Sequence, residues 1–496
     1  MALVLAAALG AASTASQATP AAAAVANAPP PVAMALVIRD QAVLRAAPRD
    51  SSPTHATLIA GEIVEVRGER LDHFQVWDHH RERGGYVRVE QLKVTRFAAD
   101  EAADLLGLVR FVRESRGAEA LGIGLAAAYV KSAAPADLRG ETGAEAFEAV
   151  GRFAERLAQR AALSGSGAGV AAQMDVAARY GVRFVTFESD GQLRHCYDGQ
   201  AYAQALVLSR DAARRARSVL ALTRPDCVDS ALSPSAAAAL AARQADLLDA
   251  LETQALPATL KNRVYMRRAA VHAMLAFLEA RRGASPTEAA QRSLSAFALV
   301  NRAELTDDDQ AAYNDAAMRA NASRWAAVPA AARQLPRGLT LTAQAGQPGE
   351  TCVRLAAGAS STQSVSRCTY GQVWVASATA NREGTAVALA VQVLPAWREL
   401  WLFRHDGQEW AVTVLPPAAV SPGLGYAEFA GWVPGGNQVL VAREARGENR
   451  YRRSYEVLNL QSLIADRQSG EPATMGAFQR WADPQWRTLS LAATAR

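Results

Sequence analysis

The stretch from Ala42 to Val94 constrains the fold more than any other part of the chain. It begins with Ala42-Val43-Leu44-Arg45-Ala46-Ala47-Pro48, continues after a polar turn with Leu58-Ile59-Ala60-Gly61-Glu62-Ile63-Val64-Glu65-Val66, and closes with Gly85-Tyr86-Val87 and Leu92. Short apolar runs separated by turn residues are typical of β-strands. We therefore predict a small β module here.

One hairpin of this module can be predicted in detail. A two-residue turn at Arg81-Glu82 sets Trp77 opposite Tyr86, Val76 opposite Val87 and Phe74 opposite Val89. Because side chains alternate between the two faces of a strand, the valines and the phenylalanine point inward, and the Trp and Tyr share the outer face. Gly84-Gly85 can move the turn or add a bulge, which would change this register.

The module resembles a bacterial SH3 (SH3b) domain and covers residues 33–97. Members of that family begin with an L-R-x-x-P-like strand and turn, carry a glycine before the central strand and end in G-[WY]-V. The matching residues here are Leu44-Arg45 with Pro48, Gly61, and Gly85-Tyr86-Val87. The resemblance implies a β-barrel that works outside the cytoplasm and binds peptides or cell-wall material. The family usually has tryptophan where Phe74 stands, so its ligand groove is not carried over.

Trp77 and Tyr86 are the candidate ligand-binding residues. Two aromatic side chains on one outer face can form a binding platform. Aromatic pairs across strands also stabilise sheets, and the two rings could equally pack against the next domain. The sequence leaves both interpretations open.

Length and charge limit the class of protein. A chain of 496 residues is too long for one ordinary core, so we expect two to four domains, and 50% hydrophobic with 20% charged residues is globular. The 53 basic residues are nearly matched by 48 acidic ones, which leaves a net charge of +5. Nucleic-acid binding proteins concentrate basic residues on one face, so we expect no nucleic-acid partner.

The N-terminus predicts export. Residues 2–12 are apolar and rich in alanine, and small-residue triplets at 16–18 and 26–28 are candidate cleavage sites. The positive n-region of a signal peptide is missing, since Arg39 is the first basic residue. We interpret residues 1–28 as a signal peptide and the start of an Ala/Pro-rich linker. No later apolar run reaches the 18 or so residues that a membrane span needs, so we expect no transmembrane segment in the mature chain and a periplasmic or secreted location.

The cysteines predict two disulfides. Cys196 and Cys227 form one local pair, and Cys352 and Cys368 form the other. Pairing within each region is the simplest of the three connectivities, and an exported chain can form such bonds. Neither spacing resembles a zinc site, so we assign no metal.

Residues 98–330 predict a helical domain with one β-hairpin. Apolar residues follow helical spacing in several segments, and short connections favour antiparallel neighbours. The hairpin is predicted where Asp190-Gly191 separates two β-prone runs. Five basic residues are interpreted as a solvated face: Lys261, Arg267, Arg268, Arg281 and Arg282. The acidic run at 307–309 fits a helix start better than a cation site.

The predicted disulfide of this region constrains its helices. A continuous helix from Gln200 to Leu222 would hold Cys227 about 30 Å or more from Cys196. A disulfide needs Cα atoms within about 7 Å. We therefore predict that the helix breaks near Ser209, which can cap a second helix that doubles back.

Residues 336–496 predict an antiparallel β domain. Strand-like runs alternate with turn residues, and the stretch from Phe429 to Val441 resembles a blade of TolB-like or WD-like propellers, with Val433 and Gly435 in place of the usual serine and aspartate. One or two blades cannot close a propeller. We expect a small sheet or sandwich with blade-like hairpins.

The sequence carries no strong catalytic signature. His-Glu-x-x-His, Cys-x-x-Cys, Gly-x-Ser-x-Gly and EF-hand patterns are all missing. His195-Cys196 resembles part of a cysteine hydrolase, but neighbouring residues of a strand point to opposite faces. Glu114 is the nearest match to the catalytic glutamate of lysozyme-like transglycosylases. His73, His79 and His80 could hold a weak metal site, although an exposed polar turn is the simpler interpretation.

The sequence as a whole predicts a multidomain α+β protein of the bacterial cell envelope. We expect it to be non-enzymatic, to need no cofactor, and to bind peptidoglycan, a peptide or an envelope protein through the SH3-like module. The alternative is a cell-wall (peptidoglycan) hydrolase with a divergent active site in the helical region, whose catalytic residues the sequence does not name.

Overall fold

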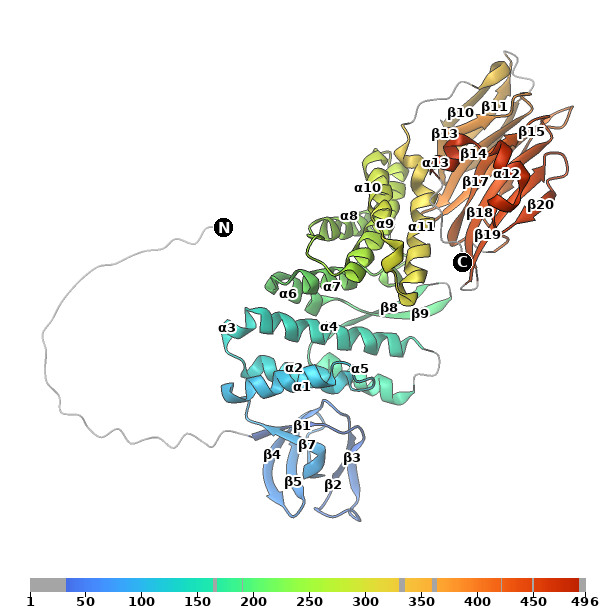
Figure 1. Cartoon of the computed structure of the whole chain (residues 1–496). Coiled ribbons are helices and arrows are strands. Elements are labelled where there is room, and N and C mark those ends of the chain that lie inside the picture. Colours follow the sequence, from blue (N-terminus) through green and yellow to red (C-terminus); the bar gives the residue numbers. More distant parts are fainter. Residues whose placement is uncertain are drawn as a thin grey trace, which may run out of the picture. The chain divides into compact units, whose positions relative to one another are not determined.

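The chain has a mixed α+β architecture with several sheets and helices α1–α13 (Figure 1). The computed structural model describes residues 33–163, 167–189, 191–329, 335–358, 364–420, 422–447 and 450–489. The predicted signal peptide lies outside these residues. The chain divides into two compact units: the first contains the residues up to Leu58 and Ile63–Arg96, and the second contains Ile59–Glu62 and Phe97 onward. No helix within the described ranges is long and apolar enough to cross a membrane.

The first unit is a seven-stranded antiparallel sheet. Its strands are β1 (Ala33–Val37), β2 (Ala42–Arg45), β3 (Thr54–Leu58), β4 (Ile63–Arg70), β5 (His73–Asp78), β6 (Arg83–Arg88) and β7 (Leu92–Thr95). They pair in the order β3-β2-β6-β5-β4-β1-β7. Alternate apolar side chains of these strands, among them Leu44, Val64, Val76 and Val87, form its core. The prediction that this part of the chain is rich in β-strands is therefore confirmed. The barrel that the resemblance implies is not closed within the described residues, because β3 and β7 are edge strands that do not pair with each other.

The register predicted for the β5–β6 hairpin is wrong by two residues. Trp77 pairs with Gly84, and Tyr86 pairs with Gln75, because the turn comprises four residues, 79–82, instead of two. The Asp78 side chain accepts hydrogen bonds from the backbone N–H groups of His80 and Arg81 and stabilises the longer turn. A shift of two residues preserves the faces, so Val76 and Val87 are still buried.

The first part of the second unit is helical. Its helices are α1 (Ala102–Val112), α2 (Glu119–Ser132), α3 (Pro135–Leu138), α4 (Glu141–Ala161), α5 (Ala168–Arg179), α6 (Gln200–Leu208), α7 (Ala212–Leu222), α8 (Pro234–Asp249), α9 (Ala258–Arg281), α10 (Thr287–Ala298) and α11 (Gln310–Ser323). Helix α9 packs against α8, α10 and α11, and α4 packs against α2 and α6. The predicted hairpin is present as β8 (Phe184–Ser189) and β9 (Gln192–Tyr197).

The predicted helix break is present between α6 and α7. It brings Cys196 and Cys227 within a Cα–Cα distance of 5.8 Å, and the two are bonded. The capping residue differs from the prediction. Asp211 caps α7 by accepting a hydrogen bond from the backbone N–H of Arg214, whereas the Ser209 hydroxyl donates to Glu141 on α4. The Ser209 side chain therefore bonds to a distant residue, Glu141, instead of capping the helix that follows it.

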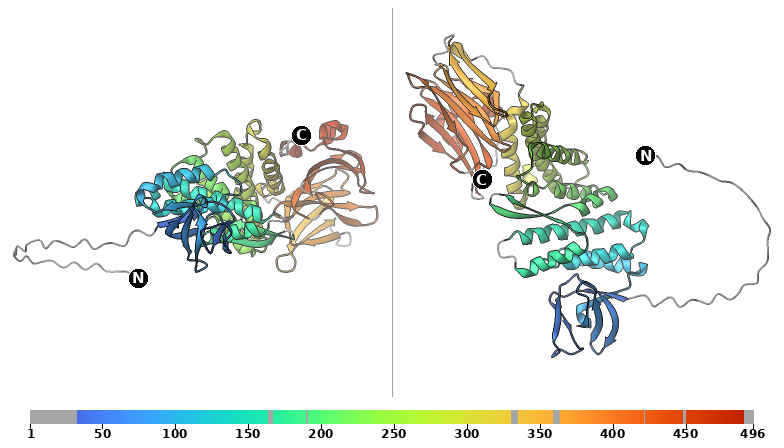
Figure 2. Two further views of the ribbon diagram at one scale, coloured as in Figure 1. Left: turned by 90° about the horizontal axis from the view of Figure 1, so that it is seen from below. Right: turned by 180° about the vertical axis from the view of Figure 1, so that it is seen from behind.

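The last part of the unit consists of two sheets. Strands β10 (Leu339–Ala345), β11 (Thr351–Ala357) and β12 (Ser364–Thr369) form the smaller one. The larger contains β13 (Gln372–Ala380), β14 (Ala386–Leu394), β15 (Trp397–His405), β16 (Trp410–Leu415), β17 (Leu424–Val433), β18 (Gln438–Gly447), β19 (Arg450–Asn459) and β20 (Ala465–Ser469). Side chains of both sheets, including Val353, Leu355, Leu389 and Phe403, share one core. Helix α11 packs against β17 (Figures 1 and 2).

The prediction of an antiparallel domain needs one correction. β15 pairs in parallel with β17 through Trp397 and Arg398, while the rest of the same edge pairs with β16. After β15 the chain turns back as β16, which pairs with the later part of β15. It then begins β17 beside the first residues of β15, so β17 runs in the same direction as β15. The blade-like stretch forms the β17–β18 hairpin, and helices α12 (Gly476–Trp481) and α13 (Pro484–Leu489) cover one face of it.

Candidate binding sites

Trp77 lies on a glycine and under an arginine on the outer face of the first unit. A Cβ built on Gly84 would come within 3.1 Å of the indole ring, so the ring rests directly on that residue. The guanidinium group of Arg67 lies 4.5 Å from the ring centroid, which is a cation–π contact. Tyr86 occupies the diagonal position across the hairpin and is half-buried, as Trp77 is. The two candidate ligand-binding residues therefore share one face, although they are not directly paired.

Charged residues surround this aromatic face. Glu65 pairs across the sheet with Trp77, accepts hydrogen bonds from Arg67 and contacts His79 at 2.6 Å. The hydrogen bond from Arg67 lowers the pKa of Glu65 most, and the hydrogen bond from His79 lowers it further. The indole thus has a polar rim, which is the usual setting of an aromatic contact residue at a binding surface.

The three clustered histidines have separate roles. His73 is buried and its Nδ1 lies 2.6 Å from Asp72, which corrects the interpretation of all three as an exposed polar turn. His79 and His80 are exposed. Within the described ranges, the one group of three potential metal ligands is Glu350 with Cys352 and Cys368. Those two sulfur atoms are bonded to each other, so they offer no thiolate to a metal.

Both candidate hydrolase residues have other partners. Glu114 is exposed and forms ion pairs with Arg113 at 3.2 Å and Arg152 at 3.3 Å. It therefore differs from the carboxyl in an apolar pocket that serves as a general acid in glycoside hydrolysis. Cys196 is in a disulfide, and the His195 ring contacts Thr186 on the neighbouring strand. The alternative of a cell-wall hydrolase remains a prediction.

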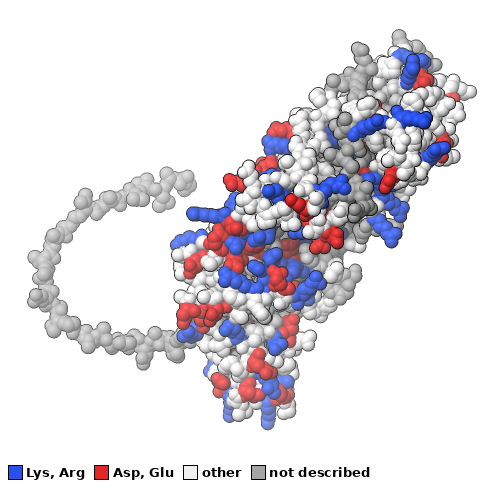
Figure 3. Space-filling view, viewed as in Figure 1, with Lys and Arg blue, Asp and Glu red and all other residues white. Residues whose placement is uncertain are grey.

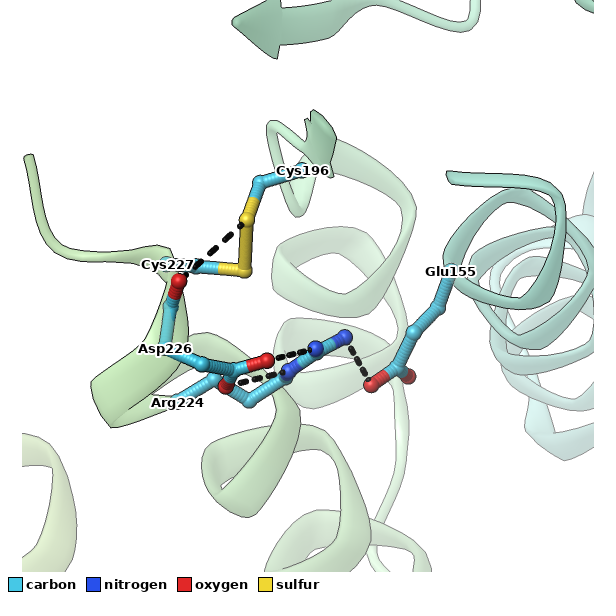
Figure 4. The surroundings of a disulfide bond; sticks show 5 residues. All are labelled: Glu155, Cys196, Arg224, Asp226 and Cys227. Atoms are coloured by element: carbon cyan, nitrogen blue, oxygen red, sulfur yellow. Dashed lines mark hydrogen bonds and ion pairs between the residues drawn. A yellow bond between two sulfur atoms is a disulfide. The ribbon is translucent and has the colours of Figure 1, made fainter. Parts of the chain in front are cut away.

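The Cys196–Cys227 disulfide lies beside a charged cluster (Figure 4). Arg224 donates hydrogen bonds to Asp226 and to Glu155 of α4, and the Tyr202 hydroxyl donates to the other oxygen of Glu155 at 2.7 Å. Burial alone would raise the pKa of Asp226, but Arg224 holds it below its usual value. The disulfide, together with Glu155, Tyr202 and Arg224, lines a cavity of about 220 Å³.

Breaking the Cys196–Cys227 bond is expected to loosen the β8–β9 hairpin. The bond spans 31 residues, and closing such a loop contributes about 3 to 4 kcal/mol on the chain-entropy model. An isolated two-stranded hairpin is marginal by itself, so the loss should concentrate there. In the double Cys→Ser variant, hydrogen exchange should show β8–β9 amides opening roughly several hundredfold more often. The matched variant without Cys352–Cys368 should leave these amides unchanged. Unchanged exchange after loss of Cys196–Cys227 would contradict the prediction.

A larger cleft in the second unit was missed in the sequence. It has a volume of about 800 Å³ and is lined by α4, α7, α9 and α11. Arg267 lines it and donates to the backbone carbonyl of Leu220, which corrects its interpretation as part of a solvated face. Arg268 and Arg281 also donate to backbone carbonyls. Several distant segments build the cleft, and no local spacing brings them together.

No known protein family, curated protein or solved structure matches the chain. The two units and their surfaces are therefore the basis for assigning a function.

Proposed function

We propose that the chain is an exported binding protein of the bacterial cell envelope, and that its first unit is an SH3-like module. The module recognises peptidoglycan, a peptide or an envelope protein, and Trp77 and Tyr86 contact that partner. The observation that carries the proposal is the half-buried Trp77, which rests on Gly84 at the centre of a polar rim.

The residues of the SH3b resemblance support this proposal because they meet in space. Leu44-Arg45 lies on β2 and Gly85-Tyr86-Val87 lies on β6, and Arg45 pairs directly with Tyr86. A Cβ on Gly85 would lie 2.7 Å from the carbonyl oxygen of Arg45 and 2.8 Å from the Leu44 side chain. Only glycine fits such an approach, so the glycine of the G-[WY]-V pattern has a packing reason in this chain.

Export is supported by the cysteines. Both pairs are disulfides, and no free cysteine is present among the described residues. Disulfides persist mainly in oxidising compartments such as the periplasm. The signal peptide predicted at residues 1–28 would deliver the chain there.

Trp77→Ala is expected to weaken binding to the partner roughly thirtyfold, because losing a central aromatic contact typically costs about 2 kcal/mol. Binding to peptidoglycan is measured by co-sedimentation of the full-length chain with purified peptidoglycan. Binding to proteins is measured in a second experiment, in which the full-length chain captures solubilised envelope proteins. The control is Leu71→Ala, which removes an apolar side chain that is 79% exposed in the turn between β4 and β5.

Thermal unfolding separates recognition from folding. Phe74 packs against the core of the first unit, so Phe74→Ala should lower its stability. Trp77→Ala should lower it less, because the indole lies outside that core. Equal destabilisation by the two variants, or unchanged binding after Trp77→Ala, would show that the aromatic face is structural.

A further inference from the structure

The cleft of about 800 Å³ in the second unit gathers charges of both signs. Eight arginines and seven acidic residues from α4, α7, α9, α11 and the adjoining turns line it. Figure 3 shows blue and red side chains crowding around a hollow in this helical region. A mixed lining of this kind can be a closed network of ion pairs or a site for a charged ligand, and the pairing of each group distinguishes the two.

Almost every carboxylate of the cleft already has a cation. Glu114 is shared by two arginines, Glu148 by Arg214 and Arg217, and Arg224 bridges Glu155 and Asp226. Asp309 pairs with Arg263 at 2.6 Å, and Asp315 pairs with Arg446 at 2.7 Å. Asp308 alone among these acids has no ion pair with the described residues. The cleft therefore has little remaining capacity for cations.

Two arginines of the cleft form no ion pair with a carboxylate of the described residues. Arg267 of α9 donates to the backbone carbonyls of Leu220 and Thr223, and Arg319 of α11 has neither a hydrogen bond nor an ion pair with any residue of the described ranges. Both side chains are half-buried. Burial lowers the pKa of Arg267 to about 10; the charges of Asp226 and Glu155 oppose this shift, and those of Arg224 and Arg319 add to it. Two guanidinium groups that repel each other in a cleft are stabilised by an anion bound between them.

We propose that this cleft binds a short peptide with free ends, whose terminal carboxylate lies between Arg267 and Arg319 and whose terminal ammonium lies at Asp308. A guanidinium group matches the planar carboxylate with paired N–H donors. Eight arginines and seven acids line the cleft, so its net charge is small, which suits a zwitterion better than a polyanion.

The spacing of the two ends sets the length of the peptide. Asp308 lies in the short 3-10 turn before α11, which begins at Gln310, and Arg319 lies eleven residues after Asp308; applying the helical rise to the whole stretch gives a separation of about 16 Å. An extended chain spans about 3.3 to 3.6 Å per residue. A peptide of about five residues therefore reaches from one end of the site to the other, and a cleft of 800 Å³ lies within the usual range for small-ligand sites.

The test is calorimetric titration of the full-length chain with pentaalanine that has free termini. The wild-type chain should bind it, and amidation of the C-terminus should weaken binding about tenfold or more, because a charge-assisted hydrogen bond to arginine is lost. Arg319→Gln should have the same effect on the free peptide and none on the amidated one. N-terminal acetylation and Asp308→Asn should form a second matched pair with a smaller effect, since Asp308 is exposed.

Two controls make the result specific. Arg139→Gln changes an exposed arginine after α3, outside the cleft, and should leave the affinity unchanged. Leu71→Ala, which changes an exposed side chain of the first unit, should also leave it unchanged. No heat of binding with pentaalanine at millimolar concentration would overturn the proposal. Equal binding of the free and amidated peptides, or binding of inorganic phosphate in place of the peptide, would overturn it as well.

Discussion

Replacing Glu428 with alanine is expected to lower the free energy of unfolding of the second unit by about 3 to 5 kcal/mol. Glu428 lies on β17 and is buried between the helical part and the sheet. One of its oxygens pairs with Arg324 at 3.1 Å and accepts a hydrogen bond from the Trp325 indole at 3.2 Å. The other pairs with Arg398, whose side chain is 0% exposed. Without the carboxylate, two buried guanidinium groups lose their counter-charge, and such a loss costs far more than an exposed ion pair contributes.

Urea unfolding followed by circular dichroism measures this loss. The control is Glu409→Ala, which removes an exposed carboxylate between β15 and β16 in the same sheet region and should change stability by less than about 0.5 kcal/mol. If Glu428→Ala unfolds at the same urea concentration as the control, the Glu428 carboxylate does not stabilise Arg324 and Arg398, and the prediction is wrong. Arg398 also donates to the backbone carbonyl of Asn321 at the end of α11, so the cluster joins the helices to the sheet.

Local sequence patterns predicted local structure well. Asp190-Gly191 between two β-prone runs gave the β8–β9 hairpin, because the turn residues and the flanking strands agree. The disulfide between Cys196 and Cys227 was a stronger constraint. A bond that requires Cα atoms within about 7 Å excludes a straight helix between them, and the chain does break after Leu208.

Long-range contacts explain what the sequence did not reveal. Ser209 looked like a cap, but its hydroxyl donates to Glu141, which lies 68 residues earlier. Arg267 was interpreted as solvated because the sequence shows only its neighbours on the same helix. Its hydrogen-bond partners, Leu220 and Thr223, lie at the end of α7. The same holds for the cleft, since its two arginines without an ion pair, Arg267 and Arg319, lie on different helices, α9 and α11. Pairs at i and i+4, such as Arg263 with Arg267 and Asp315 with Arg319, are the only local signal that these faces are charged.

The aromatic face was predicted in part. Strand alternation placed Trp77 and Tyr86 on the same side, and that conclusion survived an error of two residues in the register. The support for Trp77 was not visible in the sequence, because Arg67 reaches the indole from a bulge between Val66 and Gly68 on β4. A bulge re-aims a side chain without leaving a clear sequence signature.

The contact between α2 and α4 is expected to show strong coupling between Gly122 and Phe153. The Phe153 side chain is fully buried, and a Cβ on Gly122 would come within 2.3 Å of its ring. Phe153→Ala should therefore cost about 3 to 5 kcal/mol through the cavity it leaves. Gly122→Val should cost about 1 to 3 kcal/mol, because it forces the ring out of its position.

The double variant is the decisive measurement for this contact. Valine at position 122 fills part of the space that the missing ring leaves, so the double variant should lose less stability than the sum of the single variants, by about 1 kcal/mol or more. Gly107→Ala is the matched control, because nothing lies within 4 Å of the new methyl group on α1. Alanine there should stabilise the helix by about 0.5 to 1 kcal/mol. Additive losses at Gly122 and Phe153 would mean that the two residues do not support each other, and that the close approach of α2 to α4 does not depend on the glycine.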